Sequence, residues 1–141
     1  MRRSVVELCV EDHRGDGKIL AEWLENKTTV NFEDWIASDR HVALVAEREG
    51  AIVGFDLMNL AGVIALLYVS PDARFSGVSK ALLSALEEEA LNAGIRTMKL
   101  ESSVTALRFY RSAGYSLEGD ATHGFGLTCC YPMFRQIGRS E

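Results

Sequence analysis

The stretch "VSPDARFSGVSKALL", Val69–Leu83, joins the end of an apolar, strand-like run to an amphipathic helix through a turn of small residues and one arginine. A helix N-terminus leaves backbone N–H groups unpaired and carries a partial positive charge, so small residues there let an anion approach the backbone. Gly77 has no side chain to block this approach, and Ser76 and Ser79 carry small hydroxyls. Arg74 adds a positive charge. The stretch therefore predicts either a phosphate-binding site or a short turn without a ligand.

The spacing of apolar residues predicts strands and helices on both sides of this turn. Val6, Leu8 and Val10 alternate with polar residues and predict a strand at residues 4–11. Glutamates 87–89 are expected on the water-facing side of the helix that begins near residue 78. We expect one helix at 16–27 and another at 78–91. A short helix should begin at an N-cap Asn31, with Trp35 and Ile36 as its buried side, and a further helix should follow a cap at Ser102 or Ser103. The expected strands are at 41–49, 51–59, 61–70, 97–101, 115–118 and 127–135.

The order of these elements predicts the fold class. The strand at 61–70, the helix that follows and the strand at 97–101 require a right-handed crossover, which makes the two strands parallel. The three strands between residues 41 and 70 form an antiparallel meander, so we expect a single α/β domain over residues 1–141, with a mixed sheet of about six to seven strands and about four helices. A second strand-to-helix passage, "ESSVTALRFYRSAGY" at 101–115, predicts that two helix N-termini border one crevice.

Composition restricts the classes of partner. The net charge of -5 argues against nucleic acid or an anionic membrane surface as the main partner and favours a cationic small substrate. The apolar run at 60–69 has about half the length of a membrane span, and Glu7 interrupts the N-terminal apolar residues, so we expect a cytoplasmic protein. The odd number of cysteines, two of them adjacent, predicts reduced thiols and no metal site.

Two motifs of the chain resemble those of the GNAT superfamily of N-acetyltransferases. The pyrophosphate-binding pattern of that family is Arg or Gln, two residues, Gly, one residue, then Gly or Ala, and it is similar to Arg74, Gly77 and Ser79 here. A later family pattern, Phe-Tyr, three residues, Gly-aromatic, is similar to "FYRSAGY" at 109–115. The resemblance covers nearly the whole chain. It implies a GNAT-like fold whose parallel strands splay apart at a cofactor cleft.

The resemblance also implies a reaction. The expected activity is transfer of an acetyl group from acetyl-CoA to a primary amine of an unidentified small molecule or peptide, directly in a ternary complex, and a homodimer is a further expectation. Tyr110 is implied as the general acid toward the leaving thiolate, and the Val69 amide as the donor to the oxyanion. The residues implied in cofactor binding are Leu67, Val69, Arg74, Ser76, Gly77, Val78, Ser79, Ser103, Ala106, Phe109 and Tyr110.

The general base stays open at this point. Val63 stands where some members of the family have a glutamate, so the candidates are Asp56, Glu101 and His123, each with an alternative role as a surface or structural residue. A water chain, or an acceptor amine of low pKa, would need no dedicated base. Two alternatives to an enzyme also remain: a non-catalytic acyl-CoA-binding or regulatory module of the same fold, and an α/β interaction domain whose glycine turn binds nothing.

Overall fold

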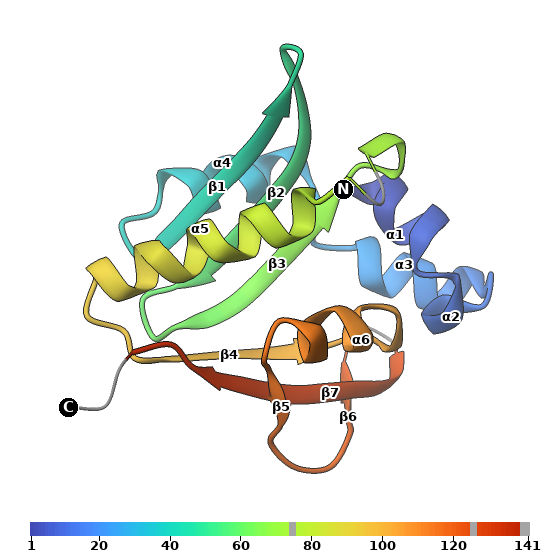
Figure 1. The fold of residues 1–141 in the computed structure, drawn as a ribbon. Coiled ribbons are helices and arrows are strands. Elements are labelled where there is room, and N and C mark those ends of the chain that lie inside the picture. Colours follow the sequence, from blue (N-terminus) through green and yellow to red (C-terminus); the bar gives the residue numbers. More distant parts are fainter. Residues whose placement is uncertain (74–75, 125–126, 139–141) are drawn as a thin grey trace.

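The computed structural model describes residues 1–73, 76–124 and 127–138, which form a mixed β-sheet with helices on both faces (Figure 1). The strand order is β1-β2-β3-β4-β7-β5, with β6 paired to β7, and β3 pairs with β4 in parallel while the other described pairs are antiparallel. The predicted mixed α/β fold is confirmed. The strands are β1 (His41–Arg48), β2 (Ala51–Asn59), β3 (Val63–Val69), β4 (Thr97–Ser102), β5 (Ser116–Leu117), β6 (Thr122–Gly124) and β7 (Leu127–Gln136).

The helices divide between the two faces of the sheet. Helix α5 lies over β1, β2 and β3, and α6 lies over β4 and β7 on the same side, while α4 packs behind β1 (Figure 1). A Cβ built on Gly54 of β2 would lie 2.7 Å from Leu82 Cδ1, so α5 comes this close because Gly54 has no side chain. The helices are α1 (Arg2–Leu8), α2 (Val10–His13), α3 (Gly17–Leu24), α4 (Thr29–Ala37), α5 (Val78–Asn92) and α6 (Val104–Ser112), with a 3-10 turn η1 (Pro71–Ala73).

The strand predicted at residues 4–11 is wrong, because α1 and α2 occupy this segment. Val6 and Val10, which the strand prediction placed on one apolar face with Leu8, are 43% and 53% exposed. Val5 and Cys9 are buried instead. Residues four apart lie on one face of a helix, so the chain buries the helical pair rather than the alternating set.

Helix α4 begins earlier than its predicted cap. Thr28 is the N-cap, because its Oγ1 accepts a hydrogen bond from the Asn31 backbone N at 3.2 Å. The Asn31 side chain instead donates to the Asn26 carbonyl at 2.7 Å. Trp35 is partly buried as expected, but Ile36 is exposed, so the prediction for Ile36 is wrong.

The main core lies between α5, α6 and the sheet, and it contains Met58, Ile64, Leu83, Leu86, Ala90, Met98, Leu100, Tyr110, Tyr115 and Met133. Glu87 borders this core, contrary to its predicted place on the water-facing side. Its carboxylate accepts hydrogen bonds from Tyr115 Oη at 3.2 Å and Arg135 Nη1 at 2.7 Å. Burial, together with the Glu87 charge, raises the pKa of Tyr115, so the phenol stays a donor to this carboxylate.

Candidate active site

The parallel strands β3 and β4 separate shortly after they pair. Their register covers two pairs, Val63 with Lys99 and Ile64 with Leu100. Beyond these, β3 continues along β2 and β4 continues along β7, so the two strands diverge toward their carboxyl ends (Figure 1). The sheet therefore has a splay at the position that the resemblance implied.

The backbone of β3 directs polar groups toward this splay. Ser70 N donates to Val53 O at 2.7 Å, which fixes one hydrogen-bonded position of the β2–β3 ladder. Hydrogen-bonded and non-hydrogen-bonded positions alternate in an antiparallel pair, so Leu67 and Val69 turn their N–H and C=O groups toward β4. These are the two residues implied in contacts with the cofactor arm.

A cavity of about 210 Å³ lies in the splay. Eight of the predicted site residues line it, namely Leu67, Val69, Ser79, Glu101, Ser103, Ala106, Phe109 and Tyr110. Its other walls come from residues that were not predicted as site residues, mainly Leu8, Cys9, Trp23, Lys27, Tyr68, Ser102, Thr105 and Cys130. The structure thus gathers the predicted residues and adds a second wall from α1 and α3.

The N-terminus of α5 adjoins this cavity through Ser79. Gly77 is the N-cap with φ +81°, no side chain of the described residues caps the helix, and a Cβ on Gly77 would meet none of their atoms within 4 Å. The Ser76 hydroxyl donates to the Ala73 carbonyl and holds the turn. The predicted Arg74 lies outside the described residues. Gly77 therefore leaves room beside the first turn of α5, where the helix dipole favours an anion.

The N-terminus of α6 also borders the cavity, through Ser103, Thr105 and Ala106, so the prediction that two helix N-termini border one crevice is confirmed. Side chains of the protein already cap this second helix end. The Asp12 carboxylate of α2 accepts hydrogen bonds from Val104 N at 2.6 Å, Thr105 N at 3.0 Å and the Thr105 hydroxyl. Ser103 Oγ accepts from Ala106 N at 3.2 Å. A carboxylate of the protein already uses the positive end of this helix.

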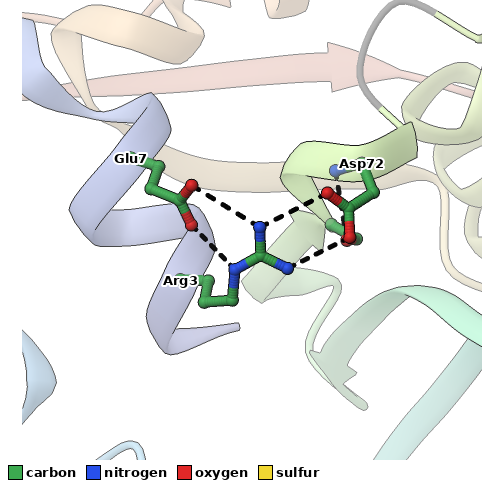
Figure 2. Close-up of polar contacts among 4 residues, drawn as sticks. Arg3, Glu7 and Asp72 are labelled. Carbon is green, nitrogen blue, oxygen red and sulfur yellow. Dashed lines mark hydrogen bonds and ion pairs between the residues drawn. The ribbon is translucent and has the colours of Figure 1, made fainter.

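An ion-pair cluster ties α1 to the turn that leads into α5. Figure 2 shows the Arg3 guanidinium between Glu7 and Asp72, with closest distances of 2.8 Å and 3.1 Å. Asp72 lies in η1, and its backbone N donates to Ser70 Oγ at 3.3 Å. The hydrogen bond from Arg3, together with the Arg3 charge, lowers the pKa of the Asp72 carboxyl. All three side chains are exposed, so the cluster orients α1 and contributes little to stability.

Tyr110 projects from α6 into the core at the cavity wall. It is 7% exposed, and its ring packs edge-on against Phe109 at 5.1 Å and Tyr115 at 5.6 Å between centroids. Burial, with smaller contributions from Tyr68 and Asp56, raises the pKa of Tyr110. The phenol therefore carries its proton at neutral pH.

The three candidate bases lie in different places. Asp56 is fully buried beside α5 and does not line the cavity. Burial raises the pKa of Asp56 to about 7; the Leu44 backbone opposes this shift, but no described group makes a hydrogen bond of normal geometry to either carboxylate oxygen. Glu101 lines the cavity from β4. The side chain of His123 lies outside the described part of the structure.

Lys27, Trp23 and Tyr68 form the wall that sequence reasoning missed. Trp23 Nε1 donates to Tyr68 Oη at 3.2 Å, and burial raises the pKa of Tyr68 to about 12. Lys27 is 3% exposed, and its Nζ donates to Asn26 Oδ1 at 2.8 Å. Burial lowers the pKa of Lys27 to about 8. The sequence held a partial signal, because Lys27 follows the predicted core residue Trp23 by four positions within the helix predicted at 16–27. In the structure α3 ends at Leu24, so Lys27 reaches the cavity wall from the turn after the helix.

Two general features concern the described residues alone. None of their helices is long and apolar enough to cross a membrane. Within the same ranges, no group of three or more His, Cys, Asp or Glu side chains is placed to hold a metal ion. Cys9 and Cys130 are free thiols buried in one cluster, and burial raises the pKa of Cys9 to about 12, so Cys9 is a poor nucleophile.

Comparison with known proteins identifies the family. Residues 9–133 match the GNAT acetyltransferase domain, so the chain belongs to this family of acetyltransferase domains. A protein of Azospirillum brasilense named IAA acetyltransferase is 33% identical over 84 residues, a stretch that covers 54% of this chain and 55% of that protein. The chain thus matches about half the length of this relative.

Solved structures share the fold. The GCN5-related N-acetyltransferase of Rhodopseudomonas palustris, also titled aminotransferase, class II, aligns with a TM-score of 0.81 at 22% identity, over 96% of this chain and 84% of that one. The PaiA N-acetyltransferase of Thermoplasma acidophilum, solved with coenzyme A, aligns with a TM-score of 0.74 at 17% identity, over 96% of this chain and 92% of that one. At these identities the likeness establishes the fold alone.

Proposed function

We propose that this chain is an N-acetyltransferase that transfers the acetyl group of acetyl-CoA to a primary amine of a small molecule or peptide, directly in a ternary complex. The observation that carries the proposal is the cavity in the splay between β3 and β4, next to an α5 N-terminus that no side chain in the described part of the structure caps. Membership in the GNAT family and the coenzyme A complex of the PaiA relative support the same reaction.

The residues at the cavity fit coenzyme A. Gly77 leaves room for a pyrophosphate at the first-turn amides of α5, including those of Val78 and Ser79. Leu67 and Val69 would pair with the pantetheine arm as a neighbouring strand does. The α6 wall, formed by Ala106 and Phe109 among others, would cover the arm from the other side.

Two of the serines predicted to bind the cofactor use their hydroxyl groups within the protein instead. The Ser76 hydroxyl is engaged with the Ala73 carbonyl, and the Ser103 hydroxyl caps α6. We therefore assign both serines to holding the turns that shape the site. Their backbone groups stay next to the proposed cofactor position.

Acetyl-CoA, when bound, supplies an acyl group activated as a thioester. The Val69 amide, directed into the splay, would donate a hydrogen bond to a carbonyl oxygen that gains negative charge. The raised pKa of Tyr110 keeps its phenol protonated. This phenol would donate its proton to the departing thiolate. Since residues from both faces of the sheet line the cavity, the acceptor would enter from the α1 and α3 side.

The proton of the acceptor amine has two routes. Glu101 is the candidate base on the described cavity wall. Water in the cavity, or an acceptor already neutral at the working pH, would serve without a dedicated base. The homodimer and the cytoplasmic location stay predictions from the sequence.

A two-stage experiment tests this function. Acetyl-CoA at about 100 times its dissociation constant should stabilise the protein by about 2.7 kcal/mol in a thermal-shift assay. Free-thiol release is then followed with a panel of primary amines, and amine-dependent release is the expected result. Stabilisation without release from any amine would indicate a non-catalytic acyl-CoA-binding module, and the absence of both would contradict a coenzyme A site.

A further inference from the structure

Asp56 is a buried carboxyl group for which the reaction described above has no use. It lies in β2, opposite Leu44 of β1 and Leu67 of β3. Its side chain is fully buried, and neither carboxylate oxygen makes a hydrogen bond of normal geometry to a described residue. A buried polar group without such bonds costs free energy, and in a natural protein it calls for an explanation, for example a part in catalysis.

Asp56 and Tyr110 lie on the same face of the sheet. Side chains alternate along a strand, so Asp56 shares its face with Gly54 and Met58 of β2, and Gly54 lies beneath α5. Met58 and Tyr110 belong to the core beneath α5 and α6. Leu67, directly opposite Asp56, packs against this core and lines the cavity. Asp56 is therefore a neighbour of the cavity wall, although it does not line the cavity itself.

The charge of Asp56 acts on Tyr110 through this core. Burial is the main cause of the raised pKa of Tyr110, and negative charges on Tyr68 and Asp56 raise it further. Charges interact strongly where little water separates them, so an ionised Asp56 opposes the formation of a phenolate at Tyr110. A protonated Asp56 is neutral and removes this opposition. The protonation state of Asp56 therefore affects how readily Tyr110 can give up its proton.

The surroundings of Asp56 let its charge change near neutral pH. Burial raises the pKa of Asp56 to about 7, so protonated and ionised forms are both present at this pH. Its partners on the adjacent strands, Leu44 and Leu67, carry no charge. The buried residues of α5 are all apolar as well, namely Val78, Leu82, Leu83, Leu86 and Ala90.

The described titratable groups around Tyr110 are Tyr68 on β3, Tyr115 before β5, Glu87 on α5 and, at the cavity, Glu101, Lys27 and Cys9. Burial raises the pKa of Tyr68 and Cys9 to about 12, and it also raises that of Tyr115, so these three groups are neutral near pH 7. Burial lowers the pKa of Lys27 to about 8, so Lys27 changes charge in nearly the same range as Asp56. A test of Asp56 must therefore compare proteins that share every other group.

We propose that Asp56 controls the proton transfer by acting through Tyr110: Tyr110 protonates the departing thiolate while Asp56 is itself protonated, and ionisation of Asp56 suppresses this step. In the step the Tyr110 O–H bond breaks and the S–H bond of coenzyme A forms. The resulting phenolate regains a proton from the acceptor amine, which loses one on acetylation. This inference rests on the proposed acetyltransferase function and adds a positioning residue to it.

Asp56→Asn tests the proposal, because the amide resembles the protonated carboxyl group and cannot ionise. Thiol formation is followed in single turnovers, with the protein in excess over acetyl-CoA, so that product release does not limit the rate. We expect the rate of the parent protein, divided by that of Asp56→Asn, to fall about tenfold between pH 6 and pH 8, as the protonated fraction of a group with a pKa of about 7 does. Ionisation of the acceptor amine and of Lys27 cancels in this ratio.

The direction of the change separates the possible roles of Asp56. A ratio that is constant from pH 6 to pH 8 would overturn the proposal. A ratio that rises with pH would also overturn it, because Asp56 would then act as the general base that accepts the amine proton.

Two further variants serve as controls. Asp34→Asn removes a carboxylate from an exposed position on α4, and its rate should follow the pH profile of the parent protein. Asp56→Leu is neutral and apolar, so it should reproduce the Asp56→Asn profile even if a buried amide impairs folding. Both Asp56 variants should keep the thermal shift with acetyl-CoA, since Asp56 does not line the cavity. Loss of this shift in both would show that Asp56 only maintains the structure, contrary to the proposal.

A spectroscopic measurement tests the link between the two residues without catalysis. 3-Fluorotyrosine is placed at position 110, and its fluorine NMR signal is followed between pH 5 and pH 9 in the parent protein and in Asp56→Asn. The signal should shift with a midpoint near pH 7 in the parent protein alone. If it does so while no amine releases thiol, the link stands and the transferase function fails. The same titration in both proteins, or in neither, would contradict the link whether or not acetyl transfer occurs.

Discussion

The N-termini of α5 and α6 have similar sequences but differ in how their backbone N–H groups are used. Both follow a strand of the parallel pair, and both carry small polar residues, "SGVS" at 76–79 and "SSVT" at 102–105. At α5 the N-cap residue is Gly77 with φ +81°, and none of the side chains that the structure describes bonds to this helix end. At α6, Ser103 and the distant Asp12 accept hydrogen bonds from the first-turn amides. The chain thus keeps one helix end open and closes the other with a carboxylate of its own.

The difference assigns different tasks to the two helices. An anion gains from a helix N-terminus only where the amides and the dipole are not already used. We therefore place cofactor binding at α5, and we place at α6 the proton donor Tyr110, held rigidly because the helix start is fixed. Four variants test this division, in order of decreasing expected effect.

Gly77→Glu should abolish the thermal stabilisation by acetyl-CoA, a loss of about 2.7 kcal/mol or more at saturating ligand, because it puts a carboxylate where a pyrophosphate would bind. Gly50→Glu is the matched control. Gly50 also has φ +81°, and a Cβ added there would meet nothing within 4 Å, but it lies in the β1–β2 turn. The control carries the same backbone strain and should keep the full ligand shift. Equal shifts in the two variants would place the phosphates elsewhere.

Tyr110→Phe should lower kcat roughly ten- to a thousandfold, the usual range for one proton-transfer group, while the acetyl-CoA thermal shift stays close to that of the parent. Tyr115→Phe serves as control, because Tyr115 packs on Tyr110 but bonds Glu87 and does not line the cavity. Steady-state kinetics of both variants measure the effect. Unchanged turnover in Tyr110→Phe would remove this residue from the mechanism.

Asp56 contrasts with Asp12, because its buried carboxylate caps neither of these two helices. Its folded pKa of about 7 lies above the ordinary 3.8, so the stability it contributes is present at acid pH and is lost as the pH rises to about 7. Asp56→Asn cannot ionise, so its stability relative to the parent protein should rise between pH 5 and pH 8, by about 2 to 3 kcal/mol. Urea unfolding at both pH values measures this gain. A constant difference between variant and parent would show that Asp56 does not titrate in this range.

Asp12→Ala should cost about 1 to 2 kcal/mol of unfolding free energy, because the α6 amides lose their acceptor. Asp16→Ala is the comparison, since Asp16 caps α3 within its own turn through Lys18 N and Ile19 N. The Asp12 cap joins α2 to α6 across the fold, so its loss should cost more than loss of the local Asp16 cap. Denaturant unfolding of both variants measures the difference in unfolding free energy. An equal or smaller cost for Asp12→Ala would show that Asp12 contributes no more than an ordinary local cap.

The sequence by itself determined the β-meander, the crossover that makes β3 and β4 parallel, and the glycine at the start of α5. Each depends on local signals, namely apolar period, turn residues and the conformational freedom of Gly77. The family motifs predicted the other residues proposed to bind the cofactor, and most of those residues line one cavity.

Only the tertiary structure decided which helix end is open and what faces the acceptor. Asp12 reaches α6 across 92 positions, and Lys27 becomes a buried wall only because α3 packs against β3. The N-terminal segment misled for a related reason: Val5, Val6, Cys9 and Val10 fit a strand or a helix, and burial against α3 and β7 selects the helix. Spacing along the chain specifies faces of elements, whereas the partner of each face depends on contacts between distant residues.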